Sequence, residues 1–196
     1  MKLALATTTL ALLSLATAPA LASAITLDFE TAPSFSPIDT FYAGQGVNFG
    51  GDVLGLQNDA LGPYFSNAPS PLGVMISVGP LSTMNVDGGF VELSFFYASS
   101  ADVAGAVEVW SGMDATGTLL ASLSLTNNAQ TGCTDTAYCN FSLLGSQLSA
   151  RAYSVSFAAA ANVAAFDNVV LQTVPEPTSA LLAGLGLMGL ALSRRR

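Results

Sequence analysis

The chain contains no histidine, and its single lysine is Lys2. No fold can supply a side chain that the sequence lacks. Ser-His-Asp and Cys-His catalysis, Schiff-base chemistry in the body of the chain and zinc sites with histidine ligands are therefore excluded. Charged residues are also scarce, at 9% of the chain. Thr, Ser, Asn and Gly replace Lys and Arg, as is typical of secreted β-proteins.

Basic residues are almost absent from the middle of the chain. Residues 25–173 carry twelve acidic side chains and one basic one, Arg151, which gives a net charge of −11. Such a surface repels phosphate backbones, so a nucleic-acid partner is not expected. The charge suits solubility or cation binding. The length of 149 residues predicts one domain that buries its own core.

The N-terminus has the three parts of a secretion signal. Lys2 supplies the positive start, an apolar run extends from Leu3 to Ala18, and the small residues Ala22 and Ala24 occupy positions −3 and −1 of a cleavage site. This pattern predicts a signal peptide over residues 1–24, helical in its apolar part, with cleavage before Ile25. The alternative is an uncleaved membrane anchor.

The C-terminus, residues 174–196, also has three parts. A Pro-Glu-Pro segment precedes an apolar run of 13 residues, Ala180–Leu192, and an arginine cluster closes the chain. A helix of that length spans ~20 Å, short of the ~30 Å hydrocarbon core of a bilayer. The arginines hold the cytoplasmic side by the positive-inside rule. The prediction is a short transmembrane helix that stops transfer and leaves the domain outside.

This tripartite end resembles the PEP-CTERM sorting signal. The resemblance implies recognition and cleavage by the membrane peptidase exosortase, after export by the secretion machinery. It further implies a passage through the inner membrane of a Gram-negative-type bacterium, and then display at the cell surface or in the extracellular matrix. The alternative is a plain C-terminal anchor. The matching residues are Pro175, Glu176, Pro177, Arg194, Arg195 and Arg196.

The middle of the chain predicts an all-β domain over residues 25–173. No stretch keeps a helical apolar period for three turns, and short apolar runs alternate with turn residues such as Asp87-Gly88-Gly89. We expect a two-sheet β-sandwich of jelly-roll type, with a closed barrel as the alternative. The expected strands are Ile25–Glu30, Gln45–Phe49, Val74–Val78, Phe90–Ala98, Ala106–Trp110, Thr118–Leu125, Asn140–Leu143, Ala152–Phe157 and Val163–Leu171.

The hairpin expected over Val107–Leu125 contains Trp110, the single tryptophan. Val107 and Val109 alternate with Glu108 and Trp110, so the two valines face a core. Trp110 has two interpretations: a platform on which a sugar stacks, or a side chain that packs at the edge of the sandwich. We favour packing, because the residue lies next to a turn.

Cys133 and Cys139 are the only cysteines, with five residues between them. In an oxidising compartment two cysteines this close predict a disulfide. The loop that it closes is small, so its stabilisation lies at the low end of ~2–4 kcal/mol.

Carboxylates occur near both ends of the domain, in Leu27-Asp28-Phe29-Glu30 and in Phe166-Asp167-Asn168. If the first and last strands are neighbours, Asp28, Glu30, Asp167 and Asn168 converge and form an oxygen cage for a structural calcium ion. The motifs resemble those of lectin-like and carbohydrate-binding jelly rolls, which implies the same metal. Strand alternation places Asp28 and Glu30 on one face, and groups Asp167 with Val169. The alternative is that these acids are solvated or cap turns.

Three functions follow from these patterns. The first is a non-catalytic structural or adhesive surface protein, with a role in exopolysaccharide, biofilm or envelope architecture. The second is a carbohydrate-binding module, which coplanar exposed rings in a groove favour. An enzyme is third: glycoside hydrolysis needs two carboxylates beside a cleft, and no motif links the two considered, Glu92 and Glu108. The aromatic residues considered for sugar binding are Tyr42, Tyr64, Phe95, Phe96, Tyr97 and Trp110.

Overall fold

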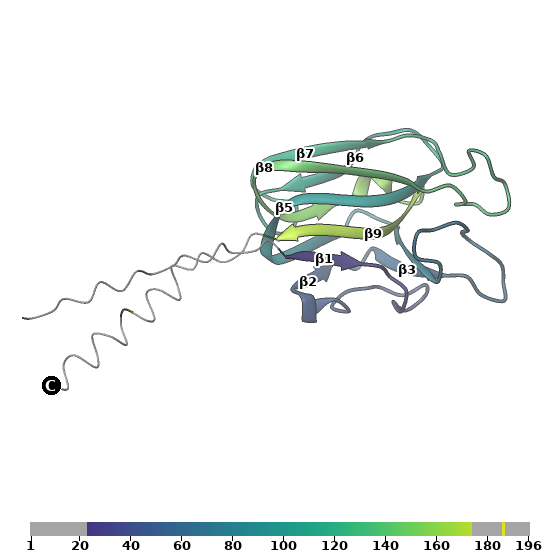
Figure 1. The fold of residues 1–196 in the computed structure, drawn as a ribbon, viewed down its shortest axis with the longest axis horizontal. Coiled ribbons are helices and arrows are strands. Elements are labelled where there is room, and N and C mark those ends of the chain that lie inside the picture. Colours follow the sequence, from purple (N-terminus) through teal and green to yellow (C-terminus); the bar gives the residue numbers. More distant parts are fainter. Residues whose placement is uncertain (1–22, 174–185, 187–196) are drawn as a thin grey trace, which may run out of the picture. The chain divides into compact units, whose positions relative to one another are not determined.

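The computed structural model describes residues 23–173 and residue 186 (Figure 1). The predicted signal helix, Ala22, the transmembrane helix and the sorting residues Pro175–Pro177 and Arg194–Arg196 lie outside these residues. Within the described part, no helix is long and apolar enough to cross a membrane. The elements are β1 (Ala24–Leu27), η1 (Ala43–Gln45), β2 (Val47–Phe49), β3 (Val53–Gln57), β4 (Gly73–Ser77), β5 (Thr83–Ser99), β6 (Val103–Trp110), β7 (Leu119–Leu125), β8 (Ser142–Ser156), η2 (Ala158–Ala160) and β9 (Ala164–Thr173).

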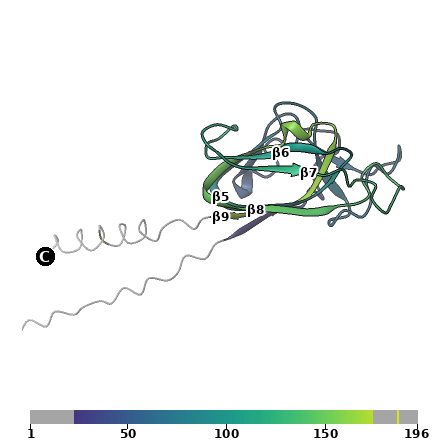
Figure 2. The same cartoon turned by 90° about the horizontal axis from the view of Figure 1, so that it is seen from above.

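The strands pair antiparallel in the order β3-β4-β9-β5-β8-β6-β7, with β1 beside β9 and β2 beside β5. The long strands β5 and β8 belong to both layers of the fold. The second half of β5 pairs with β9 and with the first half of β8, whereas its first half pairs with β2 and with the end of β8. That end of β8 then pairs with β6. Figure 2 shows the resulting layers, with β6 and β7 on one side and β5, β8 and β9 on the other.

The bend of β5 lies at Asp87-Gly88-Gly89, which the sequence predicted to be a loop. The pairing register with β8 shifts between Asn85 and Phe90, so this segment is an irregularity inside a strand of 17 residues. Gly89 has a φ of +67°, and a Cβ atom there would lie 2.8 Å from the carbonyl oxygen of Ala152. Glycine is needed because the strand changes direction against its neighbour.

The main core lies between the two layers. It contains 27 buried residues from both, among them Phe95, Phe157 and Phe166. The rings of Phe95 and Phe157 meet the ring of Phe166 edge to face, with centroids 5.6 and 5.0 Å apart. Val107 and Val109 are buried here and Glu108 and Trp110 are not fully buried, as the alternation predicts.

A second core covers the opposite face of the β3-β4-β9 region. Val74 of β4 and Ala165 of β9 lie in this second core. Their neighbours in sequence, Met75 and Phe166, lie in the main core. Successive side chains of a strand point to opposite faces, so these strands are buried on both. The second core has four fully buried residues, Leu56, Phe65, Val74 and Ala165, with Tyr64, Ile76, Tyr138 and Phe141 packed around them.

The all-β sandwich agrees with the expected class, and the hairpin of β6 and β7 and the pairing of β1 with β9 are present. The described strands end their path at β3 and β7, which do not pair, so the sheet is not a closed barrel. The jelly-roll form stays a prediction. Two element predictions were wrong: β3 was missed, and the two strands predicted at Asn140–Leu143 and Ala152–Phe157 are the two ends of one strand, β8.

The segment Ala22–Val174 is one compact unit. It contains both cores, every strand pairing and the disulfide described below. It therefore has what a domain needs to fold without the rest of the chain.

Candidate functional site

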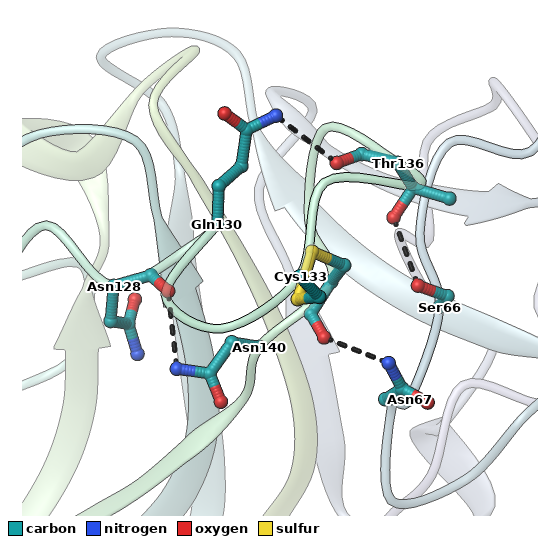
Figure 3. The surroundings of a disulfide bond; sticks show 8 residues. Ser66, Asn67, Asn128, Gln130, Cys133, Thr136 and Asn140 are labelled. Atoms are coloured by element: carbon teal, nitrogen blue, oxygen red, sulfur yellow. Dashed lines mark hydrogen bonds between the residues drawn. A yellow bond between two sulfur atoms is a disulfide. The ribbon is translucent and has the colours of Figure 1, made fainter.

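The predicted disulfide between Cys133 and Cys139 is present, with Cα atoms 6.0 Å apart. Figure 3 shows that amide and hydroxyl side chains tie the surrounding loop in place. Gln130 Nε2 donates to the carbonyl oxygen of Thr136 at 3.3 Å, and Asn140 Nδ2 donates to that of Asn128 at 3.2 Å. Asn128 is itself buried and bonded to β5. The disulfide loop is thus fixed to the sheet at its base.

The same loop is joined to the segment around Phe65. The amide of Ser66 donates to the carbonyl oxygen of Tyr138 at 2.9 Å, and Asn67 Nδ2 donates to that of Cys139 at 3.1 Å. The hydroxyls of Ser66 and Thr136 lie 3.1 Å apart. Asn58 braces this segment by accepting the amides of Tyr64 and Phe65 at its Oδ1. Two loops far apart in sequence therefore form one layer over the second core.

A surface hollow of about 230 Å³ opens at the edge of this loop layer. Its aromatic residues are Phe35, Tyr64 and Tyr138, and Leu56 and Ile76 come from strands β3 and β4. None of the lining residues within the described part of the chain carries a formal charge. Concave sites with aromatic walls and a few polar groups are those that bind small ligands.

Phe35 is the most exposed aromatic residue of the hollow, with 52% of its surface accessible. Its ring lies edge to face with that of Tyr64, with centroids 5.2 Å apart and planes at 84°. Its φ is +51°, a region that costs a bulky residue about 1–2 kcal/mol. The amide of Phe35 donates to the carbonyl oxygen of Gly55 at 2.8 Å, which holds this backbone conformation.

Of these three aromatic residues, Tyr64 was among those considered for sugar binding from the sequence. Phe35 and Tyr138 were missed. Pro33 and Pro37 flank Phe35, and that loop signal was the only indication. Of the other candidates, Tyr42, Phe95 and Tyr97 are buried in the main core, and Phe96 lies within β5.

Trp110 lies near the end of β6 opposite Ser154 of β8. The turn between β6 and β7 folds over this position, since Ser154 Oγ donates to the carbonyl oxygen of Gly112 at 2.6 Å and accepts the amide of Ala115 at 3.0 Å. Trp110 is partly buried, and its Nε1 is enclosed without a hydrogen-bond partner among the described residues. This placement favours packing over an open stacking platform.

The predicted carboxylates meet the loop at residues 69–73. Asp167 is fully buried; its Oδ2 accepts the amide of Ser70 at 2.7 Å, and its Oδ1 accepts the Ser70 hydroxyl and the amide of Asn168. Glu30 Oε1 accepts the amides of Leu72 at 2.7 Å and Gly73 at 3.1 Å. These two acids hold the loop to β9 and to the segment that follows β1.

The alternation predicted around these acids was wrong. Strand β1 ends at Leu27, before Asp28 and Glu30. Asn168 has a φ of +44°, and the register of β9 with β5 shifts there. The irregularity turns Asp167 toward Ser70, while Val169 enters the main core.

Burial raises the pKa of the Asp167 carboxyl to about 6; its bonds to Ser70 and Asn168 lower the value, and the charge of Glu30 raises it. Burial also raises the pKa of the Tyr42 hydroxyl, to about 12. That hydroxyl accepts the amide of Phe29 at 2.9 Å, which lowers the value, and the charges of Asp28, Asp167 and Glu30 raise it. The charges of these acids therefore act on one another and on the Tyr42 hydroxyl.

The three carboxylates do not assemble a cation site as they stand. Within the described residues, the one group of three acidic or sulfur side chains with ligand atoms all within 4.8 Å is Cys133, Asp135 and Cys139. Its sulfurs are joined in the disulfide, so they are not thiolate ligands. Calcium at Asp28, Glu30, Asp167 and Asn168 stays a prediction, which thermal unfolding with and without a chelator tests.

Glu92 and Glu108, the carboxylates considered for hydrolysis, occupy different parts of the fold. Glu92 lies where β5 pairs with β8 and β9. Glu108 lies on β6, which pairs with β7 and with the end of β8. The two layers of the sandwich separate these pairings.

The two ends of the domain lie side by side. β1 pairs antiparallel with β9, with Ala24 opposite Gln172. The carbonyl oxygen of Ser23 accepts both the amide and the hydroxyl of Thr173, each at 2.8 Å. The chain therefore enters and leaves the sandwich at one place.

The decisive comparison concerns the segment that follows this strand end. Residues 173–196 match the PEP-CTERM protein-sorting motif. The motif begins at Thr173, the last residue of β9, and includes the Pro-Glu-Pro segment and the arginine cluster. The PEP-CTERM motif implies export, a membrane-anchored passage and exosortase as the processing partner.

Two solved structures are similar to the domain. The K2 cleaved adhesin domain of Lys-gingipain matches 77% of this chain and 100% of its own, with a TM-score of 0.49 and 14% identity. A family 6 carbohydrate-binding module matches 76% of this chain and 94% of its own, with a TM-score of 0.42 and 14% identity. At these values, neither likeness says what this chain binds. No curated protein matches the sequence.

Proposed function

We propose that this chain is an exported protein of a Gram-negative-type bacterium that exosortase processes and that reaches the cell surface or the extracellular matrix. There its β-sandwich has a non-catalytic structural or adhesive role, within an exopolysaccharide or biofilm matrix. The observation that carries the proposal is the PEP-CTERM motif at residues 173–196, which begins at Thr173, the last residue of β9.

The paired ends of the domain support this proposal. Ser23 and Thr173 are hydrogen-bonded, so the predicted leader and the sorting segment join the domain at neighbouring positions. The predicted cut before Ile25 removes Ser23, the acceptor of both Thr173 bonds.

Composition and covalent structure support a non-catalytic role outside the cytoplasm. The domain has no histidine or lysine, and Arg151 is its one basic side chain. Acid–base and nucleophilic catalysis that depends on histidine or lysine is therefore excluded from the domain. The Cys133–Cys139 disulfide fits an oxidising compartment.

Carbohydrate binding is the second candidate function, and the aromatic hollow favours it. Phe35, Tyr64 and Tyr138 line a concave site on an otherwise acidic domain. The Phe35 and Tyr64 rings are perpendicular, so they do not form the coplanar platform that a long sugar chain needs. A site for one sugar unit is the form of this function that the hollow supports.

Processing in the native host tests the main proposal. We expect the wild-type chain to lose its C-terminal segment and to appear in the surface or extracellular fraction. The variant P175A/E176A/P177A should stay at full C-terminal length in the membrane fraction. T178A, which changes the next residue and leaves the Pro-Glu-Pro segment intact, is the matched control. Equal processing of the triple variant and of T178A would contradict the proposal.

A further inference from the structure

The exposed ring of Phe35 is held in place without being covered. It keeps a backbone conformation that disfavours large side chains, yet 52% of its surface remains accessible. An exposed aromatic ring gains by burying its face, and an accessible ring held at some cost is typical of ligand sites. Its edge-to-face contact with Tyr64 fixes the ring relative to the hollow.

The walls of the hollow are rigid before any ligand arrives. Tyr138 lies next to Cys139 of the disulfide, and its carbonyl oxygen accepts the amide of Ser66. Tyr64 is braced by Asn58 and lies next to Phe65, which is 1% exposed in the second core. A preorganised site loses little entropy when a ligand binds.

The charges around the hollow restrict the ligand. The lining carries no formal charge, whereas the domain around it has a net charge of −11. An anionic ligand is repelled by that field. The lining itself offers aromatic rings and uncharged polar groups, so an uncharged ligand is the one that its walls suit.

Polar groups of the lining, and one acid bonded to the lining residue Tyr64, indicate a ligand with hydroxyl groups. The hydroxyl of Tyr64 donates to Asp59 Oδ1 at 3.2 Å, and the same oxygen accepts the amide of Leu61 at 2.7 Å. Asp59 Oδ2 accepts no hydrogen bond within the described part of the chain and is free to accept one from a ligand. Asn162 lines the hollow and is exposed. An aromatic face beside an acidic acceptor and an amide suits a sugar ring, with its apolar C–H face and equatorial hydroxyls.

We propose that this hollow binds one uncharged pyranose unit of a polysaccharide, with its C–H face on Phe35 and its hydroxyls toward Asp59 and Asn162. This inference rests on the second candidate function, carbohydrate binding, and assigns its site. It does not depend on the sorting proposal, because the segment Ala22–Val174 lacks the Pro-Glu-Pro motif and can be tested alone.

The test is saturation-transfer NMR and calorimetry on Ala22–Val174. The probes are cellohexaose, maltohexaose and laminarihexaose, with an alginate oligosaccharide as the anionic comparison. We expect a neutral probe to bind and the alginate not to bind. F35A should weaken that binding by at least about tenfold, equivalent to 1.4 kcal/mol. Y64F, which removes the hydroxyl bonded to Asp59, should weaken it less.

F41A is the matched control, because Phe41 is 47% exposed and lies edge to face with Tyr42, at 5.1 Å and 80°. Phe41 is not among the residues of the hollow. Circular dichroism checks that both variants keep the fold. If F35A and F41A bind the sugar equally, carbohydrate binding stands and the assigned site is wrong. If no neutral probe binds, or a leucine-rich peptide binds more tightly than every sugar, the proposal is overturned.

Discussion

The two cores of this domain are built by different means. The main core gathers 27 buried residues between two layers of strands, and it needs no cross-link. The second core has four, and loops with a disulfide and bonded amide side chains cover it. Strand residues supply most of the first, together with loop residues such as Phe29, Ile38 and Tyr42, whereas the second depends on individual polar contacts. The aromatic hollow lies at the second, where irregular backbone can present side chains that strands cannot.

The largest effect should come from truncating a ring of the main core. Phe166→Ala removes the ring that contacts Phe95 and Phe157, and should cost about 3–5 kcal/mol of unfolding free energy. Phe65→Ala, in the second core, should cost less, below about 3 kcal/mol, because the covering loops can close part of the space. Chemical denaturation measures both. Equal losses of unfolding free energy in the two variants would mean that the two cores contribute equally to stability.

Stability should also depend on pH through Asp167. Its native pKa is about 6, above the ~3.9 of an unfolded chain, so the native state holds the proton to higher pH. The unfolding free energy should therefore fall as pH rises from about 4 to about 6, by up to roughly 3 kcal/mol, and then level off.

Asp167→Asn should flatten this profile, and Asp28→Asn, an exposed neighbour, should keep it. Denaturation at a series of pH values, in buffer with a chelator, gives the result. A profile in which stability rises over this range would contradict the assigned direction.

Removal of the disulfide should affect the second core alone. The double variant Cys133→Ser, Cys139→Ser opens a small loop. It should lower the free energy of unfolding of the second core by about 2 kcal/mol. Hydrogen exchange should accelerate at the amides of Ser66 and Tyr138, which bridge the two loops, and stay unchanged along β5 and β8. Loss of protection in β5 would show that the two cores unfold together.

The smallest effect concerns the paired ends. A segment that starts at Ile25 lacks Ser23 and Ala24, so the amide and hydroxyl of Thr173 lose their acceptor and Gln172 loses its partner in β1. Compared with Ala22–Val174, it should lose about 1 kcal/mol. Thr26→Ala, at an exposed position of β1, is the control. Identical thermal midpoints for the two segments would show that these bonds do not stabilise the domain.

The main core could be predicted from the sequence because strand alternation encodes it. Val107 and Val109 indicated the β6–β7 hairpin, which is present. The pairing of the first and last strands was the condition on which the convergence of the terminal acids depended, and β1 does pair with β9. β3 was missed because Gly55 interrupts its apolar run; a Cβ atom there would lie 2.6 Å from the carbonyl oxygen of Pro33.

The hollow could not be predicted in the same way. Phe35, Tyr64 and Tyr138 lie in three loops, and no periodic pattern relates them. The spacing of the two cysteines predicted the disulfide. The side-chain hydrogen bonds between Ser66 and Thr136 and from Asn67 to Cys139, which join the disulfide loop to the segment around Phe65, depend on contacts between residues far apart in sequence. The bend of β5 was hidden for a similar reason, because Asp87-Gly88-Gly89 is also a common turn sequence.

Mass spectrometry of the protein from its native host tests the account most directly. We predict an N-terminus at Ile25, a C-terminus at or near Pro175–Pro177, and Cys133 linked to Cys139. Recovery of the unprocessed chain from the cytoplasm, with both thiols reduced, would contradict the account.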